Sequence, residues 1–202
     1  MKYLLSAIFI SVVIRLTGAL HISEPQKGTC GDLGNAVPFY RTYNAAAVDH
    51  YYTASVSRVN QFDSQWALQQ VAAFVFVDQE DSTVPLYHLY NGNVVDNFYT
   101  TSMTEVEAAL KIGYQNVTTD VDPMTYIYPT QICGSTPLYR LYSASGTDNF
   151  YTTSESERLE VIANNGYADV EIAGYVLPPT PTALMLDYLS SVDFESSFIV
   201  EL

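Results

Sequence analysis

Three copies of one aromatic phrase constrain what this chain can fold into. The phrase NFYTT occurs at 97–101 and again at 149–153, and a near copy, HYYTA, begins at His50. Each copy follows an Asp and an earlier Tyr-rich phrase, which reads PFYRTYN at 38–44, PLYHLYN at 85–91 and PLYRLYS at 137–143. A recurrence about every 50 residues is typical of repeat architectures, in which each unit buries its apolar face against its neighbours.

Each copy predicts the order strand, strand, short helix, strand. The Tyr-rich phrases begin at Pro and end in turn-forming residues, as strands do, and the stretch before each NFYTT-like strand suits a hairpin loop. Ser102 with Glu105 and Ser154 with Glu157 match a capping box, and Gly113 and Gly166 stand where a helix would end. The closing strands are predicted near 71–77, 124–129 and 172–178.

The first copy is the least regular of the three. It has Ser55 but neither the Glu nor the Gly, and Gln65-Trp66 stands where the other copies have Gly-Tyr. The end of its helix is therefore left open. Trp66, the one tryptophan of the chain, is interpreted as a core residue.

These patterns predict an α+β, strand-rich fold of three ββαβ repeats in a compact pseudo-threefold arrangement. The expected organisation is a signal peptide at 1–19, an N-terminal segment at 20–36, a single domain at 37–178 with repeats at 37–83, 84–132 and 133–178, and an acidic tail at 179–202. Below, the three ranges 37–83, 84–132 and 133–178 are called the first, second and third segments.

The N-terminus and the net charge limit the partners. Lys2 precedes an apolar run that ends in small residues, which predicts a secretory signal and an extracellular location. The run is too short to span a membrane. A formal net charge of −14 would repel phosphate backbones and anionic lipids, so nucleic acid and membranes are not expected partners.

Two cysteines and one sequon fit a secreted chain. Cys30 and Cys133 predict one disulfide, which would stabilise the fold by about 4 to 5 kcal/mol in the chain-entropy model; two free thiols are the alternative. Asn116-Val117-Thr118 is a glycosylation sequon, usable where its loop is exposed. Neither a cofactor nor a metal is expected.

The ordered phrases resemble an uncharacterised repeat domain of secreted microbial proteins, found in about three copies and known as a domain of unknown function. The resemblance covers Pro38 to about Leu177 and rests on Tyr-Arg-x-Tyr, Asp-His-Phe-Tyr-Thr-Thr, Ser-x-x-Glu, Gly-Tyr and a closing Ala-Gly-Tyr-Val. It implies a secreted, lectin-like or surface-interaction domain, and it implies no activity. This chain departs from the pattern by having His in the first copy and Asn in the other two.

The candidate ligand-binding residues are polar positions that recur in the three copies. The recurring Asp can set the hairpin by bonding its own downstream amides, or it can bind a ligand. The basic position of the first strand lies between aromatic residues and near that Asp, so it can form an ion pair or part of a polar pocket. With the His or Asn that follows each Asp, the candidates are Arg41, Asp49, His50, His88, Asp96, Asn97, Arg140, Asp148 and Asn149.

Aromatic rings beside such polar groups favour carbohydrate as the ligand. No catalytic residue is assigned, because the chain has no nucleophile elbow, zinc-protease or phosphate-loop motif and only three histidines. The favoured function is a non-enzymatic, lectin-like binding module for an extracellular glycan. The alternatives are a structural or protein-interaction component of the extracellular surface and a hydrolase with an unrecognised pair of carboxylates. The oligomeric state is open.

Overall fold

A computed structural model describes residues 29–119 and 122–179 and shows a strand-rich fold with three α-helices in that part of the chain. The predicted signal peptide at 1–19 and the tail from residue 180 onward lie outside the described residues. Of the described helices, none is long and apolar enough to cross a membrane.

The first and third segments have the predicted order of elements. After a short 3-10 helix, η1 (Leu33–Asn35), the first segment contains β1 (Ala36–Asn44), β2 (Asp49–Thr53), α1 (Val56–Val59) and β3 (Trp66–Phe76). The third contains β8 (Thr136–Ser143), β9 (Asp148–Thr152), α3 (Glu155–Asn164) and β10 (Ala168–Val176).

The second segment has a strand within the predicted closing range, 124–129, but it differs from the other two segments in having another short strand before it. It contains β4 (Val84–Asn91), β5 (Asp96–Thr100) and α2 (Met103–Lys111), followed by two short strands, β6 (Gln115–Asn116) and β7 (Thr125–Ile127). The stretch between β6 and β7 includes Asp122 and Pro123, and Pro has no amide to donate to a ladder. One continuous closing strand is therefore replaced by two.

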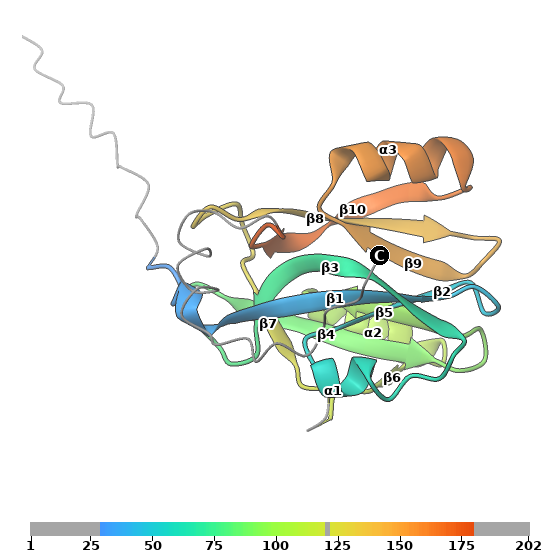
Figure 1. Cartoon of the computed structure of the whole chain (residues 1–202), viewed down its shortest axis with the longest axis horizontal. Coiled ribbons are helices and arrows are strands. Elements are labelled where there is room, and N and C mark those ends of the chain that lie inside the picture. The colour runs from blue at the N-terminus through green and yellow to red at the C-terminus, as the bar shows by residue number, and fades with distance from the viewer. Residues whose placement is uncertain (1–28, 120–121, 180–202) are drawn as a thin grey trace, which may run out of the picture.

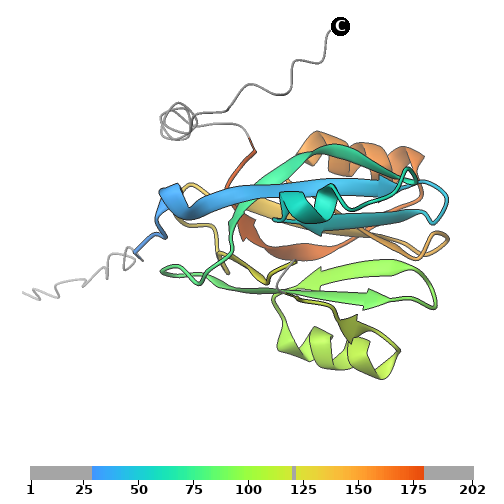
Figure 2. The ribbon, with the colours of Figure 1, turned by 60° about the horizontal axis from the view of Figure 1, so that its bottom comes forward.

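All strand pairs are antiparallel and form two sheets. The larger has the order β2-β1-β3-β7-β4-β5, with β6 also paired to β4, and the smaller has the order β10-β8-β9. Figures 1 and 2 show the strands at the centre of the molecule, with α2 and α3 on its outside at opposite ends of Figure 2.

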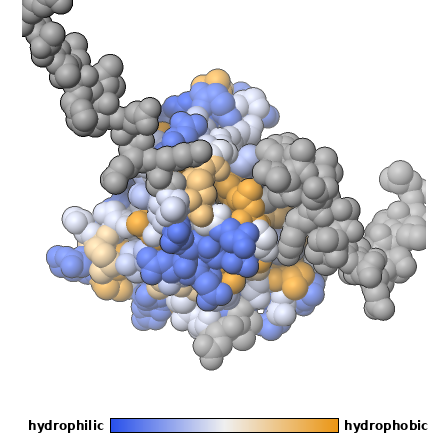
Figure 3. Space-filling view, turned by 90° about the vertical axis from the view of Figure 1, so that its left-hand side faces the viewer, coloured by the Kyte–Doolittle hydropathy of each residue, from blue (hydrophilic) through white to orange (hydrophobic). Residues whose placement is uncertain are grey.

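The closing strands of the three segments meet one another. Phe76 of β3 pairs with Tyr126 of β7, and isolated bridges join Phe74 to Leu177 and Tyr128 to Tyr175. The largest buried cluster lies among these strands and takes residues from every segment, including Phe39, Tyr52, Val75, Leu86, Tyr99, Ile127, Leu138, Tyr151 and Val176. On the face shown in Figure 3, apolar residues gather in a central patch between hydrophilic regions.

Only one of the two hydrogen bonds of the predicted capping box is present. Ser102 and Ser154 accept from the amides of Glu105 and Glu157, as predicted, and Ser55 caps α1 in the same way. The Glu side chains do not return to the cap amides, however. Glu157 accepts the hydroxyl of Thr152 at 2.5 Å, and Glu105 accepts that of Thr100. Both carboxylates therefore stay available for contacts between segments.

The helix ends and the disulfide agree with the predictions. Gly113 and Gly166 directly follow the C-cap residues of α2 and α3 and have φ of 101° and 75°, a conformation that favours glycine. Cys30 and Cys133 form a disulfide with their Cα atoms 5.6 Å apart. The bond joins the stretch that precedes the first segment to the start of the third.

Candidate functional site

Three tyrosines bond the segments to one another in a cycle. The hydroxyl of Tyr52 donates to the carbonyl of Tyr151 and accepts the amide of Tyr151, both at 2.7 Å. Tyr151 binds Tyr99 in the same manner, and Tyr99 binds Tyr52. All three side chains are buried, which excludes them from direct contact with a ligand.

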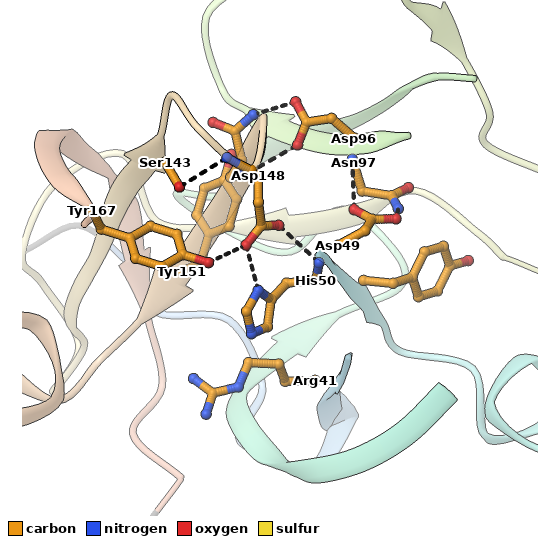
Figure 4. A network of polar contacts seen from close by, with 12 residues as sticks. Arg41, Asp49, His50, Asp96, Asn97, Ser143, Asp148, Tyr151 and Tyr167 are labelled. Carbon is orange, nitrogen blue, oxygen red and sulfur yellow. Dashed lines mark hydrogen bonds and ion pairs between the residues drawn. The ribbon is translucent and has the colours of Figure 1, made fainter. Parts of the chain in front are cut away.

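The recurring aspartates form a second cycle (Figure 4). Asp49 accepts from the amide and side chain of Asn97, Asp96 from those of Asn149, and Asp148 from the amide of His50 at 2.8 Å. The Nδ1 atom of His50 lies 2.6 Å from Asp148. Each Asp thus holds the second strand of a neighbouring segment.

The interpretation of these aspartates as turn formers is therefore wrong. The side chains of Asn44, Asn91 and Ser143, at the other end of each loop, accept the loop amides. Val48, Val95 and Thr147, directly before each Asp, have φ between 53° and 56°, which is unusual for β-branched residues. Each Asp therefore makes a contact between segments, which no local pattern in one copy could reveal.

The three carboxyl groups lie close enough together to raise the question of a bound cation. Among the described residues they are the one cluster of acidic, His or Cys side chains with such geometry, and their ligand atoms lie within 4.8 Å of one another. Burial, with the charge of Asp148, raises the pKa of Asp49 to about 8, and burial raises that of Asp96 to about 6. All three carboxyl groups already accept hydrogen bonds from a neighbouring segment, so contacts within the fold explain the cluster.

Three clefts lie where one segment meets the next. The cleft between the first and second segments has a volume of about 550 Å³, and the cleft between the third and first has about 420 Å³. The cleft between the second and third measures about 360 Å³. They are called below the first, second and third clefts, in that order. The predicted candidates all line these clefts except Asp96 and Asp148, which lie in the aspartate cycle.

In the second and third clefts an arginine covers the aromatic ring of the adjacent segment. Arg41 lies 4.8 Å from the centre of the Phe150 ring and bonds both oxygens of Glu157. Arg140 lies 4.2 Å from the ring of Phe98 and bonds Glu105 at 2.9 Å. The predicted ion pair is thus real, and its partners are the helix Glu and, for Arg140, also Glu171 opposite it on β10, but not the recurring Asp. These pairs occupy the faces of Phe150 and Phe98, while the tyrosine rings of the two clefts stay half-buried.

The first cleft has other residues at the positions of this arginine and this glutamate. His88 stands at the arginine position, and its ring stacks on Tyr99 with centres 4.3 Å apart. Arg58 stands at the position of Glu105 and Glu157, three residues after the capping Ser. The missing carboxylate comes instead from Asp122, which accepts the hydroxyl of Thr53 at 2.6 Å and lies 3.3 Å from His88. Burial acts to raise the pKa of Asp122, but the hydrogen bonds that it accepts, first of all from His88, lower the pKa below its usual value.

Half-buried aromatic rings line the same cleft. Trp66 and Phe62 of the first segment stack with their centres 4.8 Å apart, and Tyr90 of the second segment also lines the cleft. Trp66 is therefore a cleft residue, and its interpretation as a core residue is wrong. Phe62, Arg58 and Asp122 were missed by the sequence reasoning because they fall where the first copy and the end of the second depart from the repeat.

The family of the chain is shown by comparison with family models. The model of a family described as a domain of unknown function, DUF5648, matches residues 35–177. That range covers well over half of the chain. The chain belongs to this family. No curated protein and no solved structure matches it.

Membership of the DUF5648 family agrees with the resemblance to an uncharacterised domain and carries no activity with it. The matched range begins just before β1 and ends at Leu177, the residue that forms an isolated bridge with Phe74. It therefore includes all three clefts and both cycles of contacts.

Proposed function

We propose that this chain is a secreted, non-enzymatic module that binds carbohydrate in the first cleft. In this proposal the three segments are copies of one ββαβ unit around a pseudo-threefold axis. The two cycles of tyrosine and aspartate contacts support that view, because each contact recurs in every segment. The disulfide fits an extracellular location.

One observation carries the choice of cleft and of ligand. Trp66, Phe62 and Tyr90 are half-buried side chains in the largest of the three clefts, beside polar groups already fixed by the fold. Asn97 is held by Asp49 and His88, and His88 by Asp122. Sugars stack their C–H faces on rings and need such fixed donors and acceptors for their hydroxyls. In the second and third clefts the arginines cover Phe150 and Phe98, and the half-buried rings there are tyrosines.

A glycan array probed with the mature chain tests the proposal. We expect binding to a restricted group of glycans, lost in Trp66→Ala and kept in Tyr142→Ala, which removes a half-buried ring from the third cleft. A well-folded sample that binds no glycan would contradict the proposal and would favour a protein-interaction component of the extracellular surface. Asn116 is exposed on β6, so its glycosylation remains a prediction that mass spectrometry of the secreted protein can check.

A further inference from the structure

Arg58 differs from the other arginines of the described residues. Arg41, Arg140 and Arg158 each form at least one ion pair with a carboxylate. Arg58 forms none among residues 29–119 and 122–179, and the one hydrogen bond of its side chain there runs from Nε to the hydroxyl of Tyr51 at 3.2 Å. Within these residues its two terminal nitrogens have no hydrogen-bond partner.

Arg58 lines the first cleft beside two aromatic rings. The guanidinium lies 4.9 Å from the centre of the Phe62 ring and 5.5 Å from that of Tyr51, and the residue lines the cleft. It is half-buried, so a ligand can reach it. Contact with two rings and the bond from Nε hold the planar group in one orientation, which favours bidentate recognition of a carboxylate.

The acids of the cleft already have partners. Asp122 accepts from Thr53 and Tyr51 and lies beside His88. Asp63 accepts the amide of Gln65 at 2.9 Å, and Asp49 accepts twice from Asn97. Asp49 is also largely protonated below pH 8, because burial raises its pKa to about that value. Among the described residues, Arg58 is therefore an arginine of this cleft that pairs with none of its carboxylates.

We propose that the first cleft selects acidic saccharides, with a uronate carboxylate bound by the terminal nitrogens of Arg58 while the sugar ring stacks on the Trp66–Phe62 pair. This inference rests on the proposed function and narrows its ligand to a chemical class. The net charge of −14 works against an anionic ligand at long range. Affinity must then come from the short-range pair, and it weakens as salt is added.

The experiment compares uronate tetramers with their methyl esters, which differ in charge and keep the sugar ring. The probes are tetramers of α-1,4-galacturonate, β-1,4-glucuronate and β-1,4-mannuronate, each titrated beside its ester. Binding is followed by the fluorescence of Trp66, the only tryptophan. We expect at least one acid tetramer to bind about ten-fold more tightly than its ester, as a charge-assisted contact would give.

Two arginine variants with the same change of charge locate the effect. Arg58→Gln is expected to reduce binding of the acid tetramer to the level of its ester and to leave ester binding unchanged. Arg158→Gln is the matched control, because Arg158 pairs with Glu155 and Asp169 outside the three clefts, and it should change neither. Asp63→Asn removes the exposed acid nearest in sequence to the Trp66–Phe62 pair and should tighten binding of the acid tetramer.

Three results separate the two proposals. Equal binding of every acid and its ester would overturn the inference and leave the glycan proposal standing, as would a preference for the acid that survives in Arg58→Gln. Binding of no acid and no ester, with the array also blank, would overturn both. A preference that disappears in Arg58→Gln and persists in Arg158→Gln supports the inference.

Discussion

Tyr52 and Tyr151 share two hydrogen bonds through one hydroxyl group, although they are 99 residues apart in the sequence. The Tyr52 hydroxyl both donates to the Tyr151 carbonyl and accepts the Tyr151 amide. The same pair of hydrogen bonds joins Tyr151 to Tyr99 and Tyr99 to Tyr52. One tyrosine hydroxyl in each segment therefore bonds a backbone amide and a backbone carbonyl of another segment. The hydroxyl groups take the place of a ladder partner for these amides and carbonyls, so the strands that carry the three tyrosines can be buried together.

Tyr52→Phe should destabilise the fold more than most losses of a single hydroxyl. The change leaves the amide and the carbonyl of Tyr151 without a partner in a buried site, which costs about 1 to 3 kcal/mol for each such group. Urea unfolding measures the free energy of unfolding, and Tyr43→Phe is the control, since Tyr43 is half-buried. Equal and small losses in the two variants would show that the cycle contributes little.

Much of the fold could be predicted because short sequence patterns determine its elements and recur in the three copies. The hairpins, the capping serines and the glycines after α2 and α3 all follow from short patterns. The contacts between segments could not be predicted, because the sequence does not say which segment the carboxylate of Asp49 or the hydroxyl of Tyr52 faces. The first cleft could not be predicted for another reason. Arg58 of the first segment stands where the other segments have a Glu, and the carboxylate is supplied instead by Asp122 of the second segment.

The buried aspartates make stability depend on pH in a defined direction. The pKa of Asp49 is raised to about 8 by burial and by the charge of Asp148, and an unfolded Asp titrates near 4. A raised pKa in the folded state means that this carboxyl contributes stability below the unfolded value, and that the contribution is lost as pH rises from about 4 to about 8. The loss should be of the order of a few kcal/mol.

Asp49→Asn isolates this effect. The difference in unfolding free energy between the wild type and the variant should shift in favour of the variant between pH 4 and pH 8. Asp63→Asn, at an exposed position, should show no such trend. A pH-independent difference for Asp49→Asn would contradict the raised pKa.

Trp66→Tyr should restore a contact that the first segment lacks. Tyr167 donates its hydroxyl to Asp148 at 2.5 Å and Tyr114 donates to Asp96, whereas Asp49 accepts only from Asn97 among the described residues. Trp66 pairs with Asn44 at the equivalent point of the hairpin. A tyrosine there should lower the pKa of Asp49 and raise stability at pH 8.

Trp66→Phe is the matched control, because it also removes the indole but adds no hydroxyl. We expect about 1 kcal/mol more stability at pH 8 in Trp66→Tyr than in Trp66→Phe, the usual net value of one hydrogen bond. No difference between the two variants at that pH would mean that the hydroxyl does not reach Asp49.

Reduction of the disulfide should destabilise the whole fold. Cys30 and Cys133 close a loop of 103 residues, for which the chain-entropy model gives about 4 to 5 kcal/mol. The double variant Cys30→Ser, Cys133→Ser should therefore unfold at a markedly lower urea concentration than the oxidised protein. It should match the reduced wild type, and unchanged unfolding would contradict a structural role for the bond.

The most direct test of the account is an NMR titration of the mature chain with the glycan that binds best on the array. The indole N–H of Trp66 and the amides of Phe62 and Thr119, all in the first cleft, should shift together. The amides of Val161 and Asn165 in the second cleft, and of Ala108 and Val170 in the third, should not move. Shifts confined to the second or third cleft would contradict the assignment of the first cleft as the binding site.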